Sequence, residues 1–171
     1  MTGSQRRGFT LVEILIVVVV LATLAAIVIG VFAPAGDNAR HSAIMQSLTE
    51  FREQIDLYRN HHANTLPGTP AGADPDTLFF EQMTLPTNQA GDRGPFADPQ
   101  YPFGPYFPDQ LPPNPINRSR TVMSVTAFPA SAPAGTVDNP NNPGWVYETK
   151  SGRIKVNWGG VTPDGRNYWD I

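Results

Sequence analysis

Residues 9–33 read FTLVEILIVVVVLATLAAIVIGVFA, and Glu13 is the only charged residue among them. A helix of this length runs about 37 Å at about 1.5 Å per residue, which is enough to cross a hydrocarbon core of about 30 Å. A carboxylate inside such a span costs free energy in lipid, so it indicates a function beyond plain anchoring. We therefore expect a membrane helix whose acid requires a cation.

A cut between Gly8 and Phe9 would create that cation as the new α-amino group of Phe9. On its own helix this amine lies only four residues from Glu13, at the frayed end. A neighbouring helix that is shifted along the axis is therefore the better donor. The segment predicts a chain that pairs with copies of itself.

The stretch RRGFTLVE at residues 6–13, followed by an aliphatic run, resembles the class III signal of type IV pilins and type II secretion pseudopilins. The resemblance implies that a prepilin peptidase cleaves after Gly8 and that Phe9 becomes the first residue and is N-methylated. It also implies that Glu13 guides assembly into a helical homopolymer. The implied partners are minor pilins and an inner-membrane assembly platform with its ATPase complex.

On this basis the chain divides into a leader (1–8), a transmembrane and filament-core helix (9–33) and an extracytoplasmic domain (34–171). Arg6 and Arg7 precede the span, and only one Lys or Arg lies in the 15 residues after it. The positive-inside rule then keeps the N-terminus in the cytoplasm. We expect a single-pass inner-membrane protein that contacts lipid before assembly and afterwards forms a periplasmic or extracellular filament.

Three alternatives fit the N-terminal segment less well. An uncleaved anchor needs neither the glycine-phenylalanine pair nor the acid. A secretory signal peptide would be cut near the APA sequence at residues 33–35 and release residues 36–171, but its apolar region is normally about 7 to 15 residues long. A twin-arginine signal fits RRGF at residues 6–9, yet no cofactor motif follows it.

Composition agrees with one anchor and one domain in a chain of 171 residues. The net charge is −3, and loss of the two leader arginines makes it −3 − 2 = −5, so no nucleic-acid partner is expected. The chain has no cysteine, so packing alone must stabilise the domain. It also lacks the disulfide that closes the C-terminal loop in many adhesive pilins.

Residues 37–61 are predicted to form an amphipathic helix. The PAG sequence at residues 34–36 is expected to break or kink the preceding helix, and Asp37 or Asn38 to cap a restart. Spacings of four and three residues then place one apolar stripe on the restarted helix, made of Ile44, Leu48, Phe51, Ile55 and Tyr58. This stripe is suited to cover a sheet.

Residues 62–115 are predicted to contain a linker, a short helix capped by Asp74, and a loop over 86–115 that prolines keep out of regular sheet. The proline-rich part, residues 95–115, has P-x-x-P spacings, which are typical of polyproline ligands. Its aromatic residues favour packing on the domain over recognition of a partner. These aromatics are Phe96, Tyr101, Phe103, Tyr106 and Phe107.

Residues 121–171 are predicted to form the β region, with a strand over 122–128, a hairpin of 145–147 with 154–158, and a last short strand over 168–171. The predicted fold class is α+β. A long N-terminal helix, half transmembrane and half amphipathic, packs on a small antiparallel β-sheet as in pilins.

No catalytic or nucleotide-binding motif is present, so the chain is not expected to be an enzyme. His61 and His62 are predicted to pack at a helix end, because adjacent helical residues point about 100° apart and no third ligand of suitable spacing follows. His41 is predicted to be solvated. No metal ligand and no cofactor is therefore predicted from the residues.

Resemblance to the major pseudopilins of type II secretion implies one exception, a structural calcium among the C-terminal loops. None of the available acids, Asp138, Asp164 and Asp170, matches that site individually. Two functions remain open: a structural subunit of a type IV pilus-like or type II secretion filament, and a membrane-anchored or exported binding domain that uses the Pro/aromatic loop. The sequence does not distinguish secretion from adhesion, motility or DNA uptake, nor a major from a minor subunit.

Overall fold

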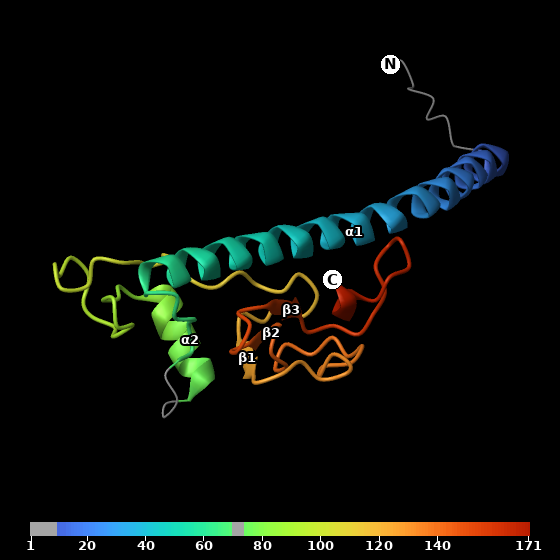
Figure 1. Cartoon of the computed structure of the whole chain (residues 1–171). Coiled ribbons are helices and arrows are strands. Elements are labelled where there is room, and N and C mark those ends of the chain that lie inside the picture. The colour runs from blue at the N-terminus through green and yellow to red at the C-terminus, as the bar shows by residue number, and fades with distance from the viewer. Residues whose placement is uncertain (1–9, 70–73) are drawn as a thin grey trace, which may run out of the picture. The chain divides into compact units, whose positions relative to one another are not determined.

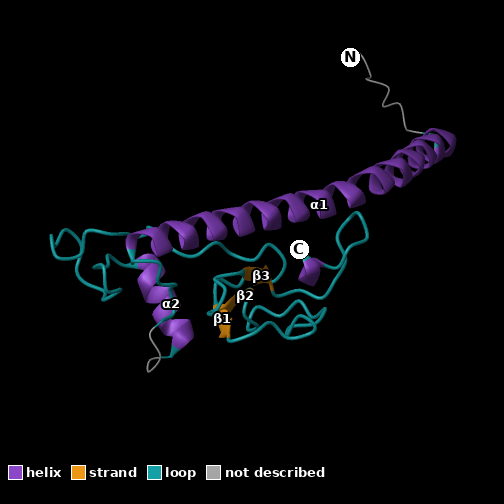
Figure 2. Cartoon of the chain, viewed as in Figure 1, coloured by secondary structure: helices purple, strands orange, loops and turns teal. Residues whose placement is uncertain are grey.

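The computed structural model describes residues 10–69 and 74–171, apart from the side chains of 29–35. The chain divides into two units, Met1–Ala39 and Arg40–Ile171. The elements are helices α1 (Leu11–His61) and α2 (Pro75–Thr84), strands β1 (Val122–Val125), β2 (Trp145–Glu148) and β3 (Ile154–Val156), and the short 3-10 helix η1 (Tyr168–Asp170). Figures 1 and 2 show this order along the chain.

A break or a kink at residues 34–36 was predicted, with a restart capped by Asp37 or Asn38. Helix α1 is continuous through Pro34, so neither the break nor the restart occurs. A proline removes a single backbone donor from the helix, and the turns on either side keep their own hydrogen bonds. Asp37 and Asn38 consequently lie inside the helix and not at its start. The amphipathic segment is thus the second part of one helix of 51 residues.

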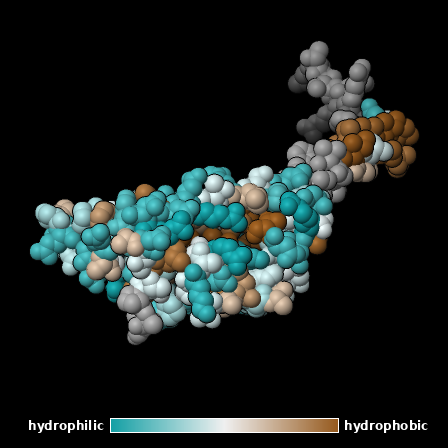
Figure 3. Space-filling model, viewed as in Figure 1, coloured by the Kyte–Doolittle hydropathy of each residue, from teal (hydrophilic) through white to brown (hydrophobic). Residues whose placement is uncertain are grey.

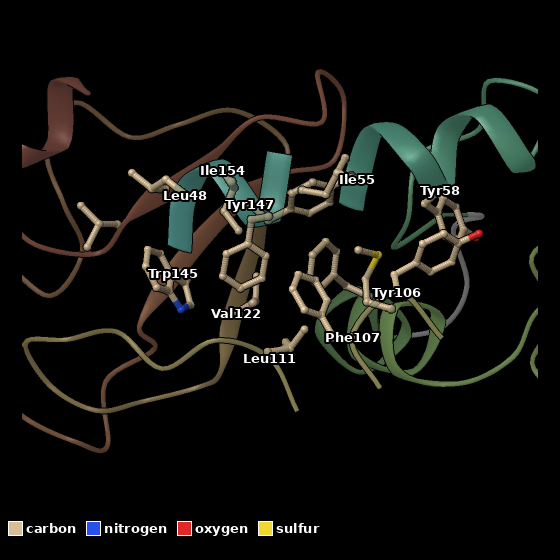
Figure 4. Packing of buried hydrophobic residues seen from close by; sticks show 14 of the residues in the cluster. Leu48, Ile55, Tyr58, Tyr106, Phe107, Leu111, Val122, Trp145, Tyr147 and Ile154 are labelled. Atoms are coloured by element: carbon tan, nitrogen blue, oxygen red, sulfur yellow. The ribbon is translucent and has the colours of Figure 1, made fainter. Parts of the chain in front are cut away.

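The predicted apolar stripe of α1 is confirmed, since all five of its members are at most 2% exposed. Phe51 is central: its ring centroid lies 5.2 Å from those of both Phe107 and Trp145. Aromatic pairs at such distances stabilise a core beyond the area that they bury. Figure 4 shows stripe residues, sheet residues and loop aromatics packed in one cluster.

The sheet has the order β1-β2-β3 and is mixed. Strands β2 and β3 form the predicted antiparallel hairpin, with Trp145 opposite Val156. Strand β1, however, runs parallel to β2, with Val122 opposite Trp145, so the prediction of a purely antiparallel sheet is wrong for this pair. The connection over residues 126–144 is long enough to return the chain to the end at which β1 began, as a parallel pair requires.

The β region also ends differently from the prediction. Strand β1 stops at Val125 rather than at residue 128, and β3 stops at Val156. The last residues form η1 instead of a strand. The side chain of Asn167 accepts a hydrogen bond from the backbone N–H of Trp169 at 2.8 Å, which caps this helical turn.

Helix α2 begins as predicted, because Asp74 accepts a hydrogen bond from the backbone N–H of Thr77 and Pro75 is its first residue. The helix buries Leu78, Phe79 and Met83. Its N-terminal turn is tied to the sheet, since Ser124 of β1 donates its backbone N–H to Asp76 Oδ1 at 2.6 Å. Helix α2 therefore stands beside the outer edge of β1.

The proline-rich loop packs mainly inward, as predicted. Tyr106 and Phe107 are at most 5% exposed and belong to the main cluster, and Phe103 packs against it. Phe96 differs from these aromatics, because its side chain is 62% exposed. One side of the loop is thus part of the core, while its tip carries an apolar side chain in solvent.

Candidate functional site

The first part of α1, Leu11–Val28, is long and apolar enough to cross a membrane, with a mean hydropathy of 3.1. It is the one such helix in the described residues, and none of this window is buried by the rest of the chain. The face of it that Figure 3 shows is mostly hydrophobic. So large an apolar surface is covered in the cell by lipid or by other chains.

Glu13 and Thr10 form a reciprocal hydrogen-bonded pair at the start of this helix. Glu13 Oε2 accepts from the backbone N–H of Thr10 at 2.8 Å and from its hydroxyl at 3.0 Å. Thr10 Oγ1 in turn accepts from the backbone N–H of Glu13 at 3.2 Å. This is a capping box, which satisfies two backbone donors that a helix N-terminus otherwise leaves unpaired.

Thr10 is absent from the site residues predicted above, although its T-x-x-E spacing with Glu13 is the sequence signature of a capping box. The pair gives the Glu13 carboxylate hydrogen bonds within its own chain. Hydrogen bonds do not neutralise the charge of the carboxylate, so the need for a cation in lipid stays a prediction. The remaining predicted residues of this site, Arg6, Arg7, Gly8 and Phe9, lie outside the described residues.

His62 packs at the end of α1 as predicted. It is 1% exposed, its Nδ1 donates to the backbone carbonyl of Tyr58 at 2.7 Å, and its Nε2 lies 3.0 Å from Thr87 Oγ1. The Tyr58 and His62 rings are stacked, with centroids 3.7 Å apart. Burial lowers the pKa of the His62 imidazole, so at neutral pH Nε2 is unprotonated and accepts a hydrogen bond from the Thr87 hydroxyl.

The other two histidines also contact tyrosines. Burial raises the pKa of Tyr106 to about 12, so its protonated hydroxyl is available to His61 Nδ1 at 2.9 Å. His41 Nδ1 lies 3.2 Å from the hydroxyl of Tyr168, and the His41 side chain is half-buried. The prediction of a solvated His41 is therefore wrong, because η1 places Tyr168 against this part of α1.

The acids considered for calcium do not form a ligand set. Asp164 accepts hydrogen bonds from Thr162 Oγ1 and from Arg166 Nε, while Asp138 and Asp170 are exposed. Over residues 10–69 and 74–171, no three His, Asp or Glu side chains are gathered so that they could hold a metal ion. Calcium takes six to eight oxygen ligands, which include backbone carbonyls as well as carboxylates, so the calcium that the resemblance implies stays a prediction without assigned ligands.

Comparison with known families identifies the N-terminal segment. The family description "Prokaryotic N-terminal methylation motif" matches residues 3–29, which include Gly8, Phe9, Thr10 and Glu13. The segment is a prepilin motif. The matched motif thus includes the whole apolar part of α1, Leu11–Val28.

The chain is also similar to a curated relative, the type II secretion system core protein G of Pectobacterium carotovorum subsp. carotovorum. The two are 29% identical over 109 residues, which cover 60% of this chain and 65% of the relative. The match therefore spans less than two thirds of the relative's own length. No solved structure matches the chain.

Proposed function

We propose that the chain is a structural subunit of a type II secretion pseudopilus or a related type IV pilus-like filament. The observation that carries this proposal is the prepilin motif on a helix whose apolar surface the rest of the chain leaves uncovered. In a filament, copies of this helix cover one another. The similarity to a core protein of type II secretion favours the pseudopilus over filaments for adhesion, motility or DNA uptake.

Maturation begins with cleavage between Gly8 and Phe9 by a prepilin peptidase, followed by methylation of the new N-terminus. Before assembly the subunit is anchored in the inner membrane, with the leader arginines Arg6 and Arg7 in the cytoplasm and residues 34–171 outside it. An assembly platform, its ATPase complex and minor pilins complete the machinery. The chain contributes packing and charge pairing to this process and no catalysis.

Glu13 is the assembly residue in this mechanism. A carboxylate in lipid costs on the order of 2 to 3 kcal/mol at mid-depth and less near the interface. The amine of a neighbouring Phe9 offsets this cost only when two helices lie side by side. The capping box with Thr10 holds the carboxylate at the start of α1, where a neighbour's N-terminus can reach it.

The alternative function, an anchored or exported binding domain, depends on the proline-aromatic loop as a ligand surface. Tyr106 and Phe107 are buried in the core, so they are not available to a partner. This arrangement favours the filament subunit.

Mass spectrometry of the mature N-terminus tests the proposal. We expect the protein from its native host to begin at Phe9, with a methylated amine. An intact Met1 or a start at Gly36 would contradict processing by a prepilin peptidase. Electron microscopy of the same cells should show the chain in fibres, and its absence from every fibre would contradict the structural role.

A further inference from the structure

A mostly apolar cleft of about 280 Å³ lies between α2 and the outer edge of β1. Its apolar lining is Phe80 of α2, Leu111 of the proline-rich loop and Val122 of β1. Leu111 and Val122 are almost fully buried, whereas Phe80 is 48% exposed. The cleft is therefore open to solvent and has apolar side chains in its wall, which suits an apolar side chain from outside.

The edge of β1 beside this cleft is poorly suited to a further strand. The Asp76 carboxylate already accepts the backbone N–H of Ser124 at 2.6 Å. A strand added here would have to displace that carboxylate. A charged side chain placed against an edge strand is a common way of protecting a sheet edge. An inserted side chain requires no such displacement, so it is the better occupant.

Phe96 is such a side chain on the same protein. It is 62% exposed and lies at the turn of residues 96–97. The loop behind it is held in place by the salt bridge between Arg93 and Glu81 at 2.8 Å and by reciprocal backbone hydrogen bonds between Thr87 and Phe103. Because the loop is already ordered, docking of Phe96 costs little conformational entropy.

Charged side chains lie beside both Phe96 and the cleft. Asp98 follows Phe96 by two residues, and its Oδ1 accepts the backbone N–H of Gln100. Arg120 lines the cleft, is exposed, and donates one guanidinium N–H to the carbonyl of Leu111 at 2.7 Å. The cleft is also lined by an anion, Asp76, whose Oδ1 accepts the backbone N–H of Ser124 at 2.6 Å. Arg120 is the more exposed of these two charges, so it is the one available to an incoming carboxylate such as Asp98, which favours docking in one orientation.

We propose that Phe96 of one copy enters the cleft lined by Phe80, Leu111 and Val122 of a second copy, with Asp98 beside Arg120. In Figure 1 the loop of residues 88–100 (yellow-green) lies on one side of α2 and β1 on the other, so the loop and the cleft lie apart on one copy. A contact between two different patches continues from copy to copy and generates a fibre unless it closes into a ring. The inference therefore rests on the proposed filament function and adds to it a lateral contact outside the membrane helix.

Cysteine cross-linking of the full-length chain in its native membrane tests the contact, because the natural sequence has no cysteine. Pro95→Cys places a thiol beside Phe96, and Thr121→Cys places one in the cleft wall while leaving its apolar side chains intact. The double variant should give a ladder of oligomers on oxidation, since each copy offers both positions. Each single variant should give dimers at most.

Two variants of this double mutant separate a specific contact from random collision. Adding Phe96→Ala should lower the cross-linking yield about tenfold, which corresponds to loss of a buried aromatic anchor worth about 1.4 kcal/mol. Replacing the Pro95→Cys site by Val161→Cys, at a position that is 68% exposed, should give no ladder. A ladder of equal yield from the Val161 pair, or one that survives Phe96→Ala, would overturn the proposal.

Charge reversal tests the orientation of the contact. Asp98→Arg and Arg120→Asp should each lower the yield, and the two together should restore it. If the cross-linking yield of the combined variant stays low, the pairing of Asp98 with Arg120 is overturned. Cross-links that form only to other proteins would show that the occupant of the cleft is not a second copy.

Absence of a ladder overturns this inference whatever else is found. The mature N-terminus of the unmodified chain is then determined by mass spectrometry, and its fibres are sought by electron microscopy. If that chain begins at Phe9 and forms fibres, the proposed function stands without this contact.

Discussion

Glu13 and Thr10 form reciprocal hydrogen bonds at the first turn of α1. The Glu13 carboxylate accepts two hydrogen bonds from Thr10, and the Thr10 hydroxyl oxygen accepts one from the backbone N–H of Glu13. The same carboxylate is proposed to pair with the N-terminus of another copy. Glu13 therefore has two separable properties, its hydrogen-bonding capacity and its charge.

Substitution of Glu13 distinguishes these properties. Glu13→Ala should leave membrane insertion intact or improved and impair filament assembly, because an apolar helix inserts more readily but lacks the pairing charge. Glu13→Gln keeps an amide oxygen that can complete the capping box but removes the charge. If charge pairing drives assembly, both variants should fail equally in a fibre count by electron microscopy. Normal assembly of Glu13→Gln would assign the role to the capping box instead.

Cleavage after Gly8 predicts that a bulky residue at this position blocks maturation. Gly8→Leu should accumulate as the unprocessed chain, which mass spectrometry of the intact protein detects by its retained leader. Gly3→Leu, in the same leader and within the matched motif, serves as the control and should be processed normally. Efficient trimming of Gly8→Leu would count against a prepilin peptidase.

His62 predicts a loss of stability in mild acid. Burial lowers its pKa in the folded state, so the unfolded chain binds a proton more readily than the folded one. The contribution of His62 is complete above the unfolded pKa of about 6.5 and is lost as the pH falls from there toward the lower folded pKa. Unfolding of the full chain in detergent, followed by tryptophan fluorescence from pH 7.5 to 5.5, should show this decline.

The matched variant for this measurement is His62→Gln, which does not titrate in this range. It should be less stable than the natural chain at pH 7.5 and should lose less stability between pH 7.5 and 5.5. An equal decline in both proteins would show that His62 is not the group responsible.

Lys155 is predicted to stabilise the C-terminal segment. Its Nζ donates to the backbone carbonyl of Trp169 at 2.5 Å and lies 5.1 Å and 5.0 Å from the ring centroids of Phe128 and Trp169. Lys155→Met keeps most of the aliphatic stem and should lower the free energy of unfolding by about 1 to 2 kcal/mol through loss of these contacts. Lys150→Met, at an exposed position, should change it by less than about 0.5 kcal/mol in the same denaturation measurement.

Local periodicity predicted the helices well. The stripe of α1 and the start of α2 depend on residues within one or two turns of each other, so neighbouring sequence is sufficient to place them. The hairpin of β2 and β3 was predicted for the same reason, since a short turn containing Gly152 joins its strands. The processing residues Gly8 and Phe9 stay predictions, because they lie outside the described residues.

The sequence by itself determined the apolar span, its single acid and the amphipathic half of α1, because these properties reside in the order of neighbouring side chains. Only the tertiary structure decided that β1 runs parallel to β2, that the chain ends in η1 against His41, and that Phe96 is exposed while Phe107 is buried. Each of these features depends on where a long connection returns the chain. The path of a long connection is determined by the packing of residues that are distant in the sequence, so local sequence patterns do not predict it.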